Sequence, residues 1–101
     1  MSIDIIAFHP TDPKYADRAY STALFVAILD LIKAKTGTSC QCHDAPENSQ
    51  MLAEVEPEET DRIGAVLLQA IQAAPADEDL QSPLIKDFAQ FLVHCKGFRW
   101  F

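Results

Sequence analysis

The most constraining feature of this sequence is a long amphipathic segment over residues 13–35. Its apolar residues recur at helical spacing and most of its charges fall on the other side, which predicts a single helix. Pro13 suits the first position of a helix, and Gly37 suits the residue that ends one. The apolar side is broad enough for a central helix that packs on more than one side, and it contains Tyr20, Leu24, Phe25, Ala27, Ile28, Leu29, Leu31 and Ile32.

Two further segments predict helices over residues 57–74 and 83–96. Pro57 is followed by Glu58, Glu59 and Asp61, and carboxylates in the first turn of a helix complement its dipole. Ser82-Pro83 opens the later segment and Gly97 closes it. Both have apolar residues at helical spacing, so each is expected to bury one face.

The two ends of the chain alternate as strands do. Residues 2–8 place Ile3, Ile5 and Ala7 on one side, and residues 98–101 place Phe98 and Trp100 together. We therefore expect an α+β fold, with the three helices on a small sheet formed by these two strands. The alternative is an all-α three-helix bundle with extended ends. Residues 50–55 suit either a short strand or a helical turn, and the length of 101 residues predicts one domain over residues 1–101.

The negative charge is concentrated in the middle of the chain. Residues 44–87 contain eleven acids and two bases, a net charge of −9, whereas the remaining residues carry a net charge of +2. Such asymmetry favours attraction of a basic protein partner. The candidate partner-binding residues are Glu54, Glu56, Glu58, Glu59, Asp61, Asp77, Glu78 and Asp79.

Those acids also have a simpler explanation. The ones after Pro57 suit a helix start, and the ones at residues 77–79 suit a solvated loop. The two groups flank one predicted helix and are expected to act together if folding brings them close. On the partner hypothesis, the chain is a non-catalytic interaction protein of inhibitor or immunity type that covers a cationic site on its partner.

Composition weighs against several other classes of function. A net charge of −7 disfavours binding to nucleic acid or to an anionic membrane surface. The first residues have no basic segment before an apolar one, and no apolar run is long enough to span a bilayer. Three cysteines without a secretory signal predict free thiols in the cytoplasm.

A sulfur and imidazole cluster, Cys40-Gln41-Cys42-His43, provides the alternative hypothesis of a metal- or thiol-dependent protein. Thiolate and imidazole are ligands that zinc prefers, and His94 is the candidate fourth ligand. The spacing Cys-x-Cys is shorter than in most structural zinc sites, so the competing interpretation is a loop with two free thiols and no cofactor. Cys95 falls on the apolar side of its helix and is expected in the core.

Sequence motifs for catalysis are missing. There is no glycine-rich phosphate loop, no Gly-x-Ser-x-Gly and no His-Glu-x-x-His, which makes an enzyme the third hypothesis.

Aromatic residues gather near the end of the chain, at Phe88, Phe91, Phe98, Trp100 and Phe101. We expect them in the core, with exposure as a partner anchor as the alternative. The simplest oligomer is a homodimer that pairs the sheet edges of two copies.

Overall fold

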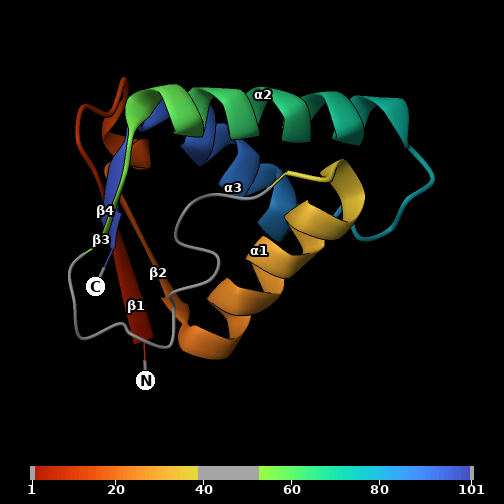
Figure 1. Cartoon of the computed structure of the whole chain (residues 1–101), viewed down its shortest axis with the longest axis horizontal. Helices are drawn as coiled ribbons and strands as arrows, with labels where there is room; N and C mark the ends of the chain where they lie inside the picture. Colours follow the sequence, from red (N-terminus) through yellow and green to blue (C-terminus); the bar gives the residue numbers. More distant parts are fainter. Residues whose placement is uncertain (1, 39–52, 101) are drawn as a thin grey trace.

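A computed structural model describes residues 2–38 and 53–100 of the chain. Three α-helices cover one face of an antiparallel four-stranded sheet whose strand order is β2-β1-β4-β3 (Figure 1). The fold is therefore α+β, as predicted, and not an all-α bundle. The elements, in chain order, are β1 (Ser2–Ala7), η1 (Pro13–Tyr15), β2 (Asp17–Ser21), α1 (Thr22–Thr36), β3 (Ala53–Val55), α2 (Pro57–Ala73), α3 (Pro83–His94) and β4 (Phe98–Trp100).

The predicted pairing of the two ends of the chain forms the middle of the sheet. β1 and β4 are antiparallel, with Ile5 opposite Trp100 and Ala7 opposite Phe98. Backbone hydrogen bonds continue beyond the strands, since the Phe8 N–H donates to Gly97 O at 2.9 Å. The predicted two-stranded sheet was too small, because β2 and β3 add one strand at each edge.

The predicted helix over residues 13–35 begins nine residues later than expected. Asp12 caps a helical turn by accepting the Lys14 N–H, but this turn is the short 3-10 helix η1. Residues 17–21 then form β2, which pairs along β1. Long-range backbone pairing overrides local helical spacing here. Ser21 starts α1 by accepting the Leu24 N–H, and Gly37, at φ 74°, ends it as predicted.

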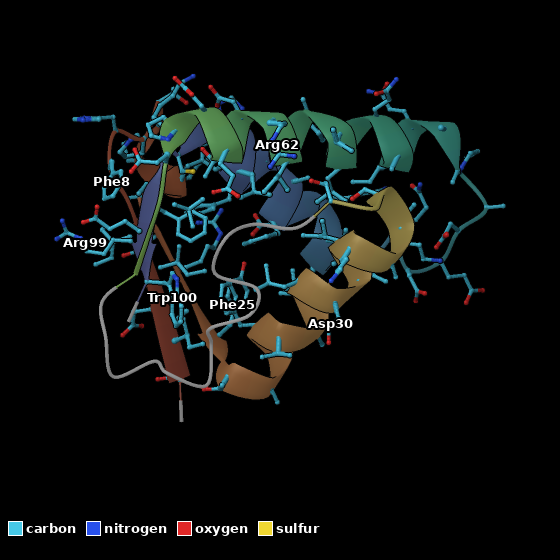
Figure 2. All side chains as sticks on the ribbon, in the orientation of Figure 1. Phe8, Phe25, Asp30, Arg62, Arg99 and Trp100 are labelled. Carbon is cyan, nitrogen blue, oxygen red and sulfur yellow. The ribbon has the colours of Figure 1, made fainter. Side chains whose placement is uncertain are left out.

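The core lies between the sheet and the helices. Ile3, Ile5, Phe98 and Trp100 point to this side, and Trp100 lies 5.9 Å from Phe25 of α1, measured between ring centroids (Figure 2). The other face of the sheet is open to solvent. There Arg99 lies over the Phe8 ring at 5.7 Å and Ile6 is 44% exposed. The aromatic residues at positions 88, 91, 98 and 100 are thus core residues, as predicted.

At Gly64, helix α2 lies close against helix α3. A Cβ atom at this position would lie 2.6 Å from Val93 Cγ1 and 3.0 Å from Leu92 Cβ. Neither of these helices matches its predicted end, since α2 ends at Ala73 and α3 at His94. Helix ends commonly differ from assignments by one or two residues.

We expect Gly64→Ala to destabilise the protein. Alanine favours a helix over glycine by about 1 kcal/mol, but its methyl group would force α2 and α3 apart, at a cost of about 1–3 kcal/mol. Chemical denaturation should therefore show a lower free energy of unfolding for the variant. A more stable variant, which helix propensity alone would produce, would contradict the close approach.

Tyr20 of β2 places a hydroxyl group in the core without a partner. The side chain is 7% exposed, and its hydroxyl has no hydrogen-bond partner within residues 2–38 and 53–100. Burial, together with the nearby Asp87 carboxylate, raises the pKa of Tyr20 to about 12, although the Arg18 guanidinium acts in the opposite direction. A buried polar group without a partner is a cost that the surrounding packing has to offset.

Tyr20→Phe is expected to raise the free energy of unfolding by about 1 kcal/mol near neutral pH, because the unpartnered hydroxyl is removed. Above pH 10 the difference should widen. The unfolded tyrosine ionises near pH 10 while the folded one stays neutral until about pH 12, so wild-type stability is lost between those values. Urea titrations at several pH values measure both effects, with Tyr15→Phe as the control. If the free energy of unfolding depended on pH in the same way in wild type and in Tyr20→Phe, the raised pKa of a buried Tyr20 would be refuted.

Candidate functional site

Five of the predicted partner-binding acids lie around the start of α2. We call them the N-terminal acidic cluster: Glu54, Glu56, Glu58, Glu59 and Asp61. Basic residues neutralise part of it. Arg99 lies 3.2 Å from Glu54, Arg62 lies 3.8 Å from Glu59 and Lys96 lies 4.0 Å from Asp61, each measured between nitrogen and carboxylate oxygen. These ion pairs are solvent-exposed or nearly so, and pairs of this kind contribute little stability.

The other three acids lie in the turn between α2 and α3. We call Asp77, Glu78 and Asp79 the turn cluster. Asp77 stabilises the turn itself, because its carboxylate accepts the backbone N–H groups of Asp79 and Leu80 at 3.0 and 3.1 Å. Lys35 of α1 donates to the same carboxylate at 2.8 Å, and this hydrogen bond is the main reason why the Asp77 pKa is lowered. Glu78 and Asp79 remain exposed.

The structure keeps the two acidic clusters apart. They lie at opposite ends of α2, a helix of seventeen residues that is about 25 Å long (Figure 1). The condition under which the two groups would act together is therefore not met, because an α-helix between them fixes their separation. Each cluster is a separate candidate surface.

Beside the turn cluster lies an apolar groove that the sequence analysis did not identify. Its volume is about 190 Å³, and it is lined by Leu24, Ala27 and Leu31 of α1, by Leu84 of α3, and by Glu78 and Asp79. Leu24 is 38% exposed. One sequence feature pointed to this groove: the apolar side of the segment that forms α1 is broad enough for packing on more than one side. Only the placement of α3 shows that part of this side is uncovered.

His94, the predicted fourth metal ligand, has structural contacts at the end of α3. Its Nδ1 lies 2.8 Å from Thr11 Oγ1, and its ring stacks on Tyr15 with centroids 4.5 Å apart. Cys40, Cys42 and His43 lie outside the described residues, as does Phe101. Within residues 2–38 and 53–100 there is no group of three or more His, Cys, Asp or Glu side chains that could hold a metal ion.

Cys95 is a core residue, as expected from its position on the apolar side of α3. Its side chain is fully buried, and its thiol donates to Leu92 O at 3.4 Å. Burial raises the pKa of the Cys95 thiol, so the reactive thiolate form is disfavoured.

Comparison with other proteins adds no assignment: no protein-family model, no curated protein and no solved structure matches the chain. None of the helices in the described part of the chain is long and apolar enough to cross a membrane. What the geometry offers chemically is a surface on which exposed carboxylates adjoin an apolar groove.

The zinc hypothesis stays a prediction with a direct test. If Cys40, Cys42, His43 and His94 bind zinc, one equivalent of the metal should protect two thiols from a thiol reagent and raise the melting temperature. Cys95→Ala is the matched control, because a buried core thiol should not contribute to this protection. A protein whose thiol reactivity and melting temperature do not respond to zinc or to chelator would contradict the hypothesis.

Proposed function

We propose that this chain is a non-catalytic interaction protein that binds a basic protein partner through its turn cluster. An inhibitor or immunity role, in which an acidic domain covers a cationic site on another protein, is the concrete form of this proposal. The observation that carries it is the exposure of Glu78 and Asp79 beside an apolar groove. Interfaces commonly combine an apolar centre with a charged rim.

The internal bonding of the turn supports this choice of surface. Asp77 holds the backbone of the turn, so Glu78 and Asp79 are presented on an ordered segment rather than on a loose one. An ordered surface loses less conformational entropy when it binds. Lys35 is the nearby base, and its ammonium group is 2.8 Å from Asp77 but 3.9 Å from Asp79. The Asp79 carboxylate is therefore the less neutralised of the two.

The N-terminal acidic cluster is the less suitable surface. Three of its five carboxylates have a basic neighbour within 4.0 Å, against two of the three in the turn cluster, but Glu58 and Glu59 also complement the α2 dipole. The helix dipole and ion pairing already account for much of this cluster. It serves as the internal comparison for the proposal.

We expect removal of charge from the turn cluster to weaken binding to basic proteins. The double variant Glu78→Gln/Asp79→Asn should lose about three- to tenfold in affinity for a small basic protein, because exposed charge pairs contribute about 0.2–1 kcal/mol each. Glu56→Gln/Glu58→Gln removes the same charge and should change affinity less. Isothermal titration against several small basic proteins and against oligolysine measures both.

Salt dependence provides the second readout. The wild-type affinity should fall as ionic strength rises from about 20 to 200 mM, since solvent-exposed charges are screened within about 10 Å at 0.1 M. An affinity that ignores salt would refute the electrostatic proposal. Equal losses in the two double variants would refute the choice of the turn cluster, because net charge alone would then explain binding.

A further inference from the structure

Helix α1 carries apolar residues on two sides, and residues 2–38 and 53–100 cover only one of them fully. Phe25, Leu29 and Ile32 are buried against the core. Leu24 and Ala27 are exposed and Leu31 is half-buried, all three facing the groove toward α3. Exposed apolar surface costs free energy in water, and a folded chain that retains it in a groove commonly uses it for binding.

The groove is too small for a typical small-molecule ligand. Its volume of about 190 Å³ is below the range of about 300–1,000 Å³ for ligand pockets. It has the size for one or two apolar side chains that project from a larger partner. A groove between helices that accepts spaced apolar side chains is the usual receptor for an amphipathic helix.

The charge at the groove determines what kind of helix fits. Glu78 and Asp79 line one part of it, and none of the nine residues that line it is basic. A helix that inserts apolar residues can therefore place lysine or arginine, three or four positions away along its sequence, beside these carboxylates. A second copy of this chain fits poorly, because two turn clusters would then face each other between protomers that each carry a net charge of −7.

We propose that the groove between α1 and α3 binds a basic amphipathic helix of the partner protein, with apolar side chains over Leu24 and Ala27 and cationic side chains at Glu78 and Asp79. This inference rests on the proposed function and adds to it the partner's secondary structure and an apolar anchor. Binding then depends on the order of residues in the partner, not on its charge alone.

The test uses two synthetic peptides of about fourteen residues with the same content of leucine and lysine. One has leucine at helical spacing, and the other has the order changed so that no apolar face forms. The wild-type protein should bind the patterned peptide about tenfold more tightly than the rearranged one, since a buried apolar anchor contributes at least that much. Fluorescence anisotropy measures both affinities.

Variants of two exposed apolar residues locate the contact. Leu24→Ser should remove the preference for the patterned peptide, as should Ala27→Arg, which places a cation in the groove. Ile6→Ser is the matched control, because Ile6 is the other large apolar side chain exposed in the described residues and lies on the open face of the sheet. Both serine variants change exposed positions, and circular dichroism is used to check that they fold.

Each outcome separates this inference from the proposed function. If both peptides bind equally and binding falls with salt, the groove is not the receptor but the acidic surface still binds basic partners. Loss of preference in Ile6→Ser but not in Leu24→Ser would place the contact on the sheet and overturn the inference. If neither peptide binds at low salt, the proposed function fails as well.

Discussion

The pairing of β1 with β4 is the constraint on which the rest of the structure depends. These two strands are far apart in sequence but adjacent at the middle of the sheet, and each carries its buried residues to the same side. Trp100 packs there against Phe25 of α1, and the ring centroids of Phe98 and Phe91 of α3 lie 6.0 Å apart. A single pair of strands thus supplies the surface on which all three helices assemble. Gly97, at φ 88°, immediately precedes β4, and its N–H donates to the buried Thr60 hydroxyl of α2 at 3.1 Å.

Much of this architecture could be predicted from local patterns. The alternation of residues 2–8, the carboxylates after Pro57 and the glycines at positions 37 and 97 are short-range signals, and the structure confirms the elements that they predict. The strand β2 was missed because residues 17–21 also fit the helical spacing of the segment that follows. Its conformation is set by pairing with β1 and by Arg18, whose guanidinium binds both carboxylate oxygens of Asp87 in α3. Neither contact is visible in a local pattern.

The candidate site shows the same division between local and long-range information. The acids themselves are plain in the sequence, but their grouping depends on the length and direction of α2, which separates residues 54–61 from residues 77–79. The groove depends on how α1 and α3 diverge, and no pattern within either helix specifies that angle. Composition therefore shows that the surface is acidic. Tertiary packing determines which carboxylates lie beside exposed apolar side chains.

The strand order has a consequence for how the chain folds during synthesis. β4 lies between β1 and β3, so the sheet stays incomplete until residue 100 has left the ribosome. Until then β1 can pair only with β2, and β3 has no neighbour among the strands already made. Contacts between segments so distant in sequence are slow to form, because the intervening chain must lose entropy first. Completion of the sheet is therefore delayed until residues 98–100 have been made, because β4 joins β1 to β3 and completes the surface on which the helices pack.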